Sequence, residues 1–279
     1  MQMVILAGGL GTRLRPFTYE TPKVLIPVDG KPFLHHQIEL LRENGIRDIV
    51  LCVGHLGDQI RAYFGQGARV GVRIRYSEER GTLLGTAGAL KNAESLLDDR
   101  FFLLYGDSYL LVDYGEVMRY FRRPSRTGLG LMVVYHNADR YERSNVIVRD
   151  GRVAVYDKEG ATHGMEYINY GLSVLRKEAL RLVPAGWPFS QEELYRLLIE
   201  RGELLAWETK HRFYEIGSRQ GLAEFRELVA SGGLAEMRER AAYRSLKAAG
   251  SFGRSLRVET RSFGHCSGRK DAPKPVVRR

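Results

Sequence analysis

Short apolar runs alternate with longer amphipathic stretches over the first half of the chain. The run at 3–7 is typical of a buried strand, and residues 32–45 repeat apolar positions at helical spacing before ending in glycine. Further strands and helices are predicted in alternation at 48–54, 57–65, 72–79, 86–97 and 100–108. This order of strand, helix and strand predicts a parallel sheet covered on both faces.

The pattern changes in the second half of the chain, where strands follow one another closely. Strands are predicted within 128–137, 145–157 and 167–180, the second containing an RDGR turn. A helix follows, opened by Ser190 with Glu193 three residues later, which is a capping-box spacing. Residues 203–218 then predict two strands and a loop. We expect an antiparallel or mixed extension of the sheet that carries an acceptor site.

Together these patterns predict an α/β fold, Rossmann-like, with a mixed and mainly parallel sheet and helices on both faces. The chain has 279 residues, of which 44% are apolar, so it can bury a large core. We assign residues 1–232 to one domain. Residues 233–279 are predicted to form a basic helix followed by a flexible tail, or one that docks on a partner subunit.

The net charge of +10 is concentrated at the C-terminal end. Residues 238–279 contain 12 Lys or Arg against 3 Asp or Glu, so the rest of the chain is nearly neutral. Steering of a polyanion by the folded body is therefore disfavoured, and nucleic acid is not the expected partner. A tail that binds RNA or a membrane surface stays open as an alternative, although it lacks interleaved aromatic residues.

Membrane insertion and secretion are also disfavoured. No apolar run approaches the roughly 18 residues that a membrane span needs, and the N-terminal apolar run is too short for a signal peptide. Cys52 lies in an apolar run and Cys266 in the polar tail, so we expect no structural disulfide. A cytoplasmic protein with no membrane partner is the expectation.

The most informative stretch is VILAGGLGTRLRPFTYETPKVLIPV, residues 4–28. Gly8, Gly9 and Gly11 follow the first predicted strand, where the absence of a Cβ lets backbone amides approach a bulky anion. Arg13 and Lys23 add positive charge close by. Glycines and cations together at a strand end indicate a phosphate site.

Two common phosphate-binding motifs do not fit this stretch. The chain has no GxxxxGK followed by Ser or Thr, which a P-loop requires. The dinucleotide fingerprint matches at Gly9 and Gly11 but has Leu14 at its third glycine position. The second strand also ends at Val53 and Gly54, without the acidic residue that holds a ribose.

The stretch as a whole resembles the signature of the sugar-1-phosphate nucleotidylyltransferases, also called nucleotide-sugar pyrophosphorylases, and especially the mannose- and heptose-1-phosphate guanylyltransferases. The resemblance is gapless over LAGG, GTRL, P, T, PK, L and PV. The matching residues are Leu6, Ala7, Gly8, Gly9, Gly11, Thr12, Arg13, Leu14, Pro16, Thr18, Pro22, Lys23, Leu25, Pro27 and Val28.

Later segments resemble the same family in the same order, up to about residue 230. GTAGAL at 85–90 is similar to the segment that lies against the nucleobase, and YGDS at 105–108 to the step whose Asp binds magnesium. YDKE at 156–159 and INYG at 168–171 resemble segments that contact the sugar. FYEIGS at 213–218 resembles the segment that supplies a second metal-binding carboxylate.

The resemblance implies a role for each matched residue. Arg13 and Lys23 would be catalytic, gripping the triphosphate and drawing the α-phosphate toward the sugar phosphate. Asp107 and Glu215 would hold Mg²⁺. The implied nucleotide-binding residues are Leu6, Ala7, Gly8, Gly9, Gly11, Thr12, Gly85, Thr86 and Gly88. The implied sugar-phosphate-binding residues are Asp157, Lys158, Asn169 and Gly171.

Two departures from the family pattern carry information. Asp157 stands where the family usually has Glu, which shortens a contact to a sugar hydroxyl. Glu215 stands where the family usually has Asp, so its longer side chain must fold differently to reach a metal ion.

The resemblance therefore implies an enzyme that joins an NTP to a sugar-1-phosphate, forming an NDP-sugar and pyrophosphate with Mg²⁺ as cofactor. It favours guanylyl transfer to mannose- or heptose-1-phosphate, although GTAGAL is also similar to members that use UTP on N-acetylated amino sugars. Base choice is expected to depend on residues 78–88. A homodimer is compatible with it. The alternative is a catalytically weak homologue that binds NDP-sugars and regulates a partner.

Overall fold

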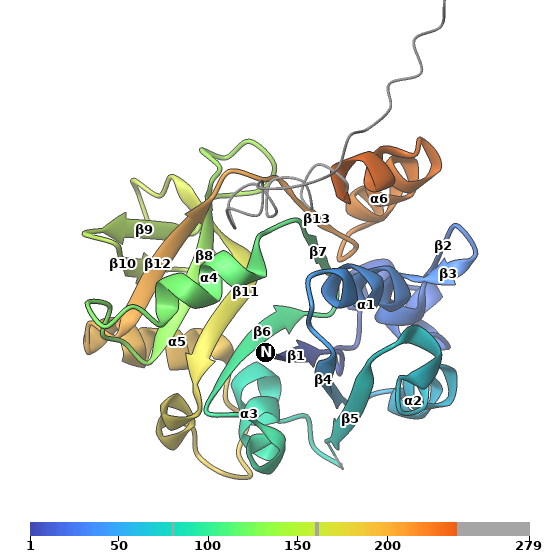
Figure 1. Ribbon diagram of the computed structural model, residues 1–279, viewed down its shortest axis with the longest axis horizontal. Helices are drawn as coiled ribbons and strands as arrows, with labels where there is room; N and C mark the ends of the chain where they lie inside the picture. The colour runs from blue at the N-terminus through green and yellow to red at the C-terminus, as the bar shows by residue number, and fades with distance from the viewer. Residues whose placement is uncertain (80, 160–161, 239–279) are drawn as a thin grey trace, which may run out of the picture.

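A mixed sheet crosses the molecule and carries helices on both faces (Figure 1). The computed structural model describes residues 1–79, 81–159 and 162–238. Within them nine strands pair in the order β5-β4-β1-β6-β11-β8-β12-β10-β9. They are β1 Gln2–Leu6, β4 Asp48–Val53, β5 Arg73–Glu78, β6 Arg100–Tyr105, β8 Gly130–His136, β9 Val146–Arg149, β10 Arg152–Tyr156, β11 Tyr167–Arg176 and β12 Leu204–Thr209. The predicted α/β class is confirmed.

The sheet changes from parallel to mixed pairing at β11. Strands β5, β4, β1 and β6 pair with one another in parallel. Strand β11 is antiparallel to both β6 and β8, whereas β12 runs parallel to β8 and antiparallel to β10. Along this strand order four neighbouring pairs are parallel and four are antiparallel, and β9 also pairs antiparallel with β11. The mixed extension predicted for the second half of the chain is confirmed.

Helices from separate parts of the sequence cover the two faces. On one face lie α1 (Phe33–Glu43), α2 (Gly57–Phe64) and α4 (Tyr114–Phe121), which contribute to one apolar cluster. On the other face lie α3 (Gly85–Asn92) and α5 (Gln191–Glu200), which contribute to a second. Each helix therefore buries its apolar side against the sheet.

Strand β1 shows why the sheet is buried on both sides. Its successive side chains point to opposite faces, so Met3 and Ile5 join the first cluster and Val4 joins the second. All three are 0% exposed. A strand in this position has no solvent face, which explains its unbroken apolar run.

A third apolar cluster joins the signature stretch to the C-terminal part of the described chain. It brings Leu14 together with Phe33, Tyr109, Ile216 and Phe225. Two small sheets lie beside it, and the last described helix completes it. These elements are β2 Pro27–Val28, β3 Lys31–Pro32, β7 Ser108–Leu110, β13 Phe213–Glu215 and α6 Arg219–Ala230.

Two helices were not expected from the sequence. Helix α4 lies between β6 and β8 in the chain. Asp113 caps its first turn, because the Asp113 side chain accepts a hydrogen bond from Glu116 N at 2.8 Å. Helix α6 occupies 219–230, ahead of the helix predicted from residue 233. Residues 233–238 are helical, and the rest of the tail lies outside the described residues, so the basic helix and tail of 233–279 stays a prediction.

The capped helix predicted from Ser190 is confirmed. Ser190 Oγ accepts from Glu193 N at 3.1 Å, and Glu193 Oε2 accepts from Ser190 N at 2.7 Å. These two bonds satisfy backbone donors that a helix start leaves unpaired. They fix the first turn of α5, which borders the cavity described below.

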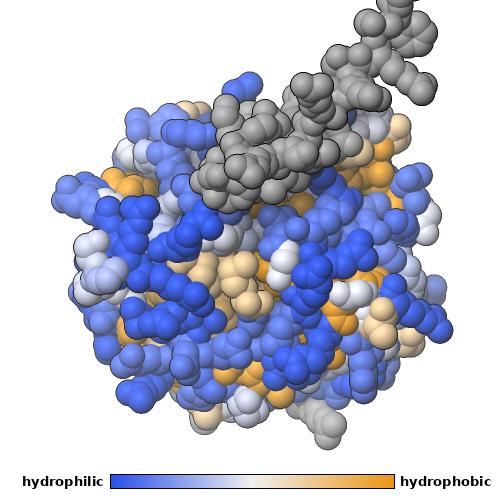
Figure 2. All heavy atoms as spheres, viewed as in Figure 1, coloured by the Kyte–Doolittle hydropathy of each residue, from blue (hydrophilic) through white to orange (hydrophobic). Residues whose placement is uncertain are grey.

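The outer surface is mixed in character. Hydrophilic residues dominate the face seen in Figure 2, with smaller apolar areas between them. Of the helices in the described part of the chain, none is long and apolar enough to cross a membrane. Cys52 is buried on the α3 side of the sheet, where burial raises the pKa of its thiol to about 12, and Cys266 lies outside the described residues.

The third cluster predicts that replacing Phe225 by alanine destabilises the protein far more than replacing Phe17. Phe225 is fully buried, with its ring centroid 5.0 Å from that of Phe33 and 5.1 Å from that of Tyr109. Phe225→Ala is expected to lower the free energy of unfolding by about 3–5 kcal/mol. Phe17→Ala is the matched control, because Phe17 is 60% exposed. Chemical denaturation measures both, and equal losses would show that α6 is not packed as described.

Candidate active site

The carboxyl ends of β1, β4 and β6 meet at one edge of the sheet. Ala7 N donates to Cys52 O at 2.8 Å, and Gly106 N donates to Leu6 O at 3.0 Å. The loops that leave these three strands are thereby fastened side by side. In open α/β sheets, ligands bind beyond the carboxyl ends of the strands.

A cavity of about 670 Å³ lies at this edge and extends toward the mixed half of the sheet. It contains seven of the residues to which the sequence assigned a role. Those are Arg13, Thr86, Asp107, Lys158, Asn169, Gly171 and Glu215. Residues more than 200 positions apart in the chain therefore line one space, and its size suits a small-molecule ligand.

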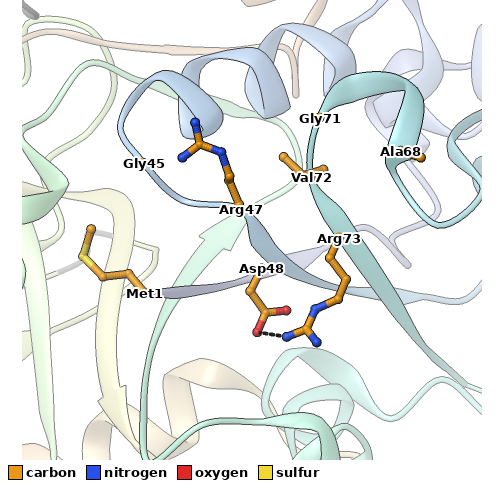
Figure 3. A pocket seen from close by; sticks show the side chains of 8 residues that line it. All are labelled: Met1, Gly45, Arg47, Asp48, Ala68, Gly71, Val72 and Arg73. Atoms are coloured by element: carbon orange, nitrogen blue, oxygen red, sulfur yellow. Dashed lines mark hydrogen bonds and ion pairs between the residues drawn. The ribbon is translucent and has the colours of Figure 1, made fainter.

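A second cavity, of about 510 Å³, lies at the opposite edge of the sheet (Figure 3). Met1, Arg47 and Arg73 border it, and Asp48 pairs with Arg73 at 3.0 Å and with Arg75 at 3.1 Å. Partial burial alone would raise the pKa of Asp48, but hydrogen bonds from both arginines lower it. This cavity is at the amino ends of the parallel strands. The Asp48 carboxylate in its wall holds the edge strand β5 to β4.

A partly buried ion pair anchors the signature stretch to the sheet. Lys23 Nζ lies 2.5 Å from Asp107 Oδ2, and the two side chains are 18% and 20% exposed. Lys23 begins a short 3₁₀ turn, Lys23–Leu25, and Asp107 directly follows β6 and Gly106. A charge-assisted bond of this length is strong and fixes both groups. The predicted cation and the predicted metal ligand are thus direct neighbours.

Three of the predicted functional groups surround Gly217. A Cβ added to Gly217 would lie 2.8 Å from Arg13 Nη2 and 3.1 Å from Asp107 Oδ2, and it would clash with Glu215 Oε2. Only glycine leaves this space open. Arg13, Asp107 and Glu215 therefore converge on one point at the end of the cavity.

The side chain of Glu215 folds back over its own loop. Its carboxylate accepts from Gly217 N and, at 2.7 Å, from Ser218 Oγ. Strand pairing sets its position, because Glu215 lies opposite Ser108 in the small sheet of β13 and β7. The longer side chain predicted to fold differently from an Asp is thus accommodated by a bend toward the start of α6.

The donor set at this point fits a hard divalent cation. Asp107 and Glu215 offer carboxylate oxygens beside the space that a Gly217 Cβ would fill. Magnesium is typically held by one or two carboxylates together with substrate phosphates. In the residues that the structure describes, no group of three or more His, Cys, Asp or Glu side chains is placed to hold a metal. The roles of Asp107 and Glu215 as metal ligands therefore stay predictions that this donor set fits.

Glu142 is a site residue that the sequence did not reveal. It lies in the loop between β8 and β9 and lines the cavity with the three groups around Gly217. Loss of hydration and then the negative charge of Glu215 raise the pKa of Glu142, which Arg13 opposes. Its loop is held by Asn137, whose Nδ2 donates to Glu142 O at 2.6 Å. The sequence carries no motif here, because only folding brings this loop to the site.

The predicted sugar end is built around the irregular middle of β11. Asn169 Oδ1 accepts from Gly171 N at 3.0 Å, and Asn145 Oδ1 accepts from Asn169 N at 2.9 Å. Gly171 has a φ of +90°, which only glycine adopts without strain. Its missing Cβ would lie 3.0 Å from Ser108 Oγ. These bonds hold Asn169 in the wall of the cavity.

Asp157 closes a turn, whereas its neighbours Lys158 and Glu159 line the cavity. The carboxylate of Asp157 accepts from Glu159 N at 3.1 Å and from Thr162 N and Oγ1 at 3.0 Å, which closes its own turn. Lys158 and Glu159 line the cavity, whereas Asp157 is not among its lining residues. A sugar contact by Asp157 stays a prediction, and Glu159 is a carboxylate at the cavity that the sequence analysis did not single out.

The glycine-rich loop approaches a carboxylate of the β5 end. A Cβ on Gly8 would lie 3.0 Å from Gly54 N and 3.1 Å from Glu79 Oε2. Gly9 has nothing within 4 Å of such a Cβ, and Gly11 adopts a left-handed φ of +60°. The loop carries the remaining predicted nucleotide-binding residues from β1 to Arg13. These are Leu6, Ala7, Gly8, Gly9, Gly11 and Thr12.

The GTAGAL segment forms the start of α3 and packs tightly against residues 187–191. A Cβ on Gly85 would lie 2.9 Å from Phe189 O, and one on Gly88 would lie 3.1 Å from Trp187 O. Thr86 lines the cavity, and its Oγ1 accepts from Gln191 N at 2.6 Å. The two glycines thus allow close packing in this structure, and their contact with a nucleobase stays a prediction.

The fold and this arrangement of cations and carboxylates define a class of α/β protein that handles phosphates at the carboxyl ends of its strands. More narrowly, the chain belongs to the nucleotidyl transferase family. The sequence model of that family matches residues 2–157, which is more than half of the chain.

Curated relatives agree with this membership. The chain is 34% identical over 195 residues to D-glycero-alpha-D-manno-heptose 1-phosphate guanylyltransferase of Aneurinibacillus thermoaerophilus, covering 69% of this chain and 82% of that protein. It is 30% identical over 224 residues to mannose-1-phosphate guanylyltransferase catalytic subunit beta of Danio rerio, and the match covers 78% of this chain and 61% of that protein. It is 31% identical over 220 residues to a UTP--glucose-1-phosphate uridylyltransferase of Synechocystis, covering 72% and 56%. The chain spans about three fifths of the length of the last two.

Solved structures share the fold. HddC from Yersinia pseudotuberculosis, complexed with GMP-PN, matches with a TM-score of 0.69 and 29% identity, covering 81% of this chain and 98% of that one. A putative glucose-1-phosphate thymidylyltransferase from Bacillus anthracis matches with a TM-score of 0.71 at 23% identity, covering 82% and 94%. The second likeness supports the fold alone.

The crowding of carboxylates predicts a pH-dependent gain in stability for Glu142→Gln. The raised pKa means that the folded state binds this proton more tightly than the unfolded state, so ionised Glu142 destabilises the fold at high pH. We expect the variant to melt at a higher temperature than the parent at pH 8, and the difference to disappear as pH falls below the pKa of Glu142. Thermal melts from pH 4 to 8 measure this, and a constant difference at all pH values would contradict it.

Proposed function

We propose that this protein transfers a nucleotidyl group from an NTP to a sugar-1-phosphate, releasing pyrophosphate. The observation that carries the proposal is the convergence of Arg13, Asp107 and Glu215 at one end of the cavity, with Lys23 paired to Asp107. Both substrates are strongly anionic, so the reaction needs positioning and positive charge more than a nucleophile on the enzyme.

The chemistry follows from these groups. An oxygen of the sugar phosphate attacks the α-phosphorus of the NTP in line, an O–P bond forms, and the bond from the α-phosphorus to the pyrophosphate oxygen breaks. Lys23 neutralises charge on the α-phosphate, and the planar fork of Arg13 grips oxygens of the departing pyrophosphate. Lys158 holds the incoming sugar phosphate. Magnesium bound between Asp107 and Glu215 would supply further neutralisation of the phosphate oxygens.

Glu79 favours guanine as the base. Its Oε1 accepts from Leu84 N at 2.9 Å, and its Oε2 faces Gly8 and Gly54 at the glycine-rich loop. The Watson–Crick edge of guanine presents two adjacent N–H donors, which suit one carboxylate, whereas uracil and thymine present carbonyl oxygens on both sides of one N–H. The relatives named guanylyltransferases favour the same base, with mannose- or heptose-1-phosphate as acceptor.

Pyrophosphate release tests the proposal. Each NTP is offered with a panel of sugar-1-phosphates, with magnesium and with EDTA. We expect release confined to few pairs, GTP with mannose- or heptose-1-phosphate first among them, and abolished by EDTA. Ligand binding without release from any pair would favour the regulatory alternative, and Glu215→Asp would be the next variant.

Lys23→Met is expected to lower kcat about 10²- to 10³-fold, because it removes a charge that acts on the reacting phosphate. Lys210→Met is the matched control, because Lys210 is an exposed residue paired with Glu208 away from the cavity. Steady-state kinetics on folded variants compare the two. Equal activity of Lys23→Met and the parent would remove Lys23 from the mechanism.

Glu79→Gln is expected to lower kcat/KM for GTP about tenfold or more relative to that for UTP, because one guanine donor loses its acceptor. Glu78→Gln is the neighbouring control, because Glu78 pairs with Arg61 instead. Competition between GTP and UTP measures the ratio directly. An unchanged ratio would show that Glu79 does not read the base.

A further inference from the structure

We propose that Gln191 determines sugar specificity by accepting a hydrogen bond from a sugar hydroxyl at the far end of the cavity, an inference that rests on the proposed function. Gln191 lines the cavity beside Ser190 and Glu192 and is 4% exposed. Its Oε1 is a buried acceptor with no hydrogen-bond partner among the described residues. An unpaired buried acceptor in a cavity wall indicates where a ligand donor belongs.

The backbone N and the amide nitrogen of Gln191 already have partners. The backbone N donates to Thr86 Oγ1 at 2.6 Å, and Nε2 donates to Tyr195 OH. Tyr195 OH in turn shares a hydrogen bond of 2.6 Å with Ser173 Oγ. The capping box of Ser190 fixes the turn from which the side chain leaves. Of the two side-chain polar atoms of Gln191, only Oε1 lacks a partner among the described residues.

Leaving that oxygen unpaired is costly. A buried acceptor without a partner loses about 1–3 kcal/mol relative to its hydrated state, and an apolar group of the same shape would avoid this loss. Oε1 is shielded from solvent in the wall. A ligand hydroxyl satisfies it when the terminal amide turns toward the cavity, and the last torsion of Gln has broad minima that permit such a turn.

The surroundings identify the ligand group as a neutral donor. Tyr156 and Asn169 are hydrogen-bonded to each other and line the same end of the cavity. Glu159 and Glu192 add carboxylate acceptors. A wall of acceptors suits the hydroxyls of a sugar. Such a site rejects a sugar that lacks the matching hydroxyl more strongly than an apolar wall would.

The test compares ligand binding to the parent and to Gln191→Met. Calorimetry gives the Kd of GDP and of GDP-mannose, with the UDP and dTDP sugars as further probes, and the unliganded melting temperature is recorded for each protein. Gln59→Met is the matched control, because the side chain of Gln59 donates to Glu20 O outside the cavity. Pyrophosphate release on the same samples tests the proposed function separately.

We expect Gln191→Met to weaken the tightest NDP-sugar about tenfold or more, to leave the Kd of the free NDP unchanged, and to melt at the same or a higher temperature. A deoxy analogue that lacks the hydroxyl should bind equally to both proteins. A lower melting temperature with unchanged sugar binding would assign Gln191 a structural role and overturn the proposal. So would a parent that binds no NDP-sugar better than its NDP. Failure to release pyrophosphate with sugar discrimination retained would remove the proposed function and leave this assignment.

Discussion

The partly buried ion pair between Lys23 and Asp107 is the contact on which the site depends. It joins a cation of the signature stretch to a carboxylate at the end of a central strand. Taking two charges even partly out of water is costly, and such a pair is held only where its surroundings are well fixed. The third apolar cluster contributes to that fixation, because it contains Leu14 and Ile216, the chain neighbours of Arg13 and Glu215. The fold thus holds Lys23 and Asp107 together in the absence of ligand. Under the proposed function, Lys23 would turn to a phosphate and Asp107 to a divalent cation.

The charges that line the cavity bear on how it would bind two phosphates. Asp107, Glu142 and Glu215 bring negative charge to the end where Arg13 lies. Three carboxylates repel phosphates, so under the proposed function a divalent ion would enter together with the substrate and offset this repulsion. The opposite end carries the carboxylates of Glu159 and Glu192 and is rich in acceptors, which suits a polyhydroxyl ligand. The polarity of the cavity therefore matches an NTP at one end and a sugar at the other.

Much of this was predictable because strand periodicity and a gapless motif are local properties of a sequence. The mixed α/β sheet, the capped start of α5 and the neighbourhood of Arg13, Lys23 and Asp107 could all be anticipated. Helix α4, of eight residues, and helix α6, of 12, were missed, and both are held by packing against the apolar clusters. Glu142, Glu159 and Gln191 were missed because loops and a helix start bring them to the site only after folding. The turn that occupies Asp157 is likewise a tertiary outcome.

The central claim is that the cavity aligns a sugar phosphate directly with the α-phosphorus of an NTP, with no nucleophile from the protein. The most direct measurement uses GTP carrying a chiral thio-substituted α-phosphate, with mannose- or heptose-1-phosphate as acceptor, and determines the configuration at phosphorus in the sugar nucleotide. A single in-line displacement predicts transfer with inversion. Retention would require a covalent enzyme intermediate and would contradict the account, as would the absence of transfer with every NTP analogue of this kind.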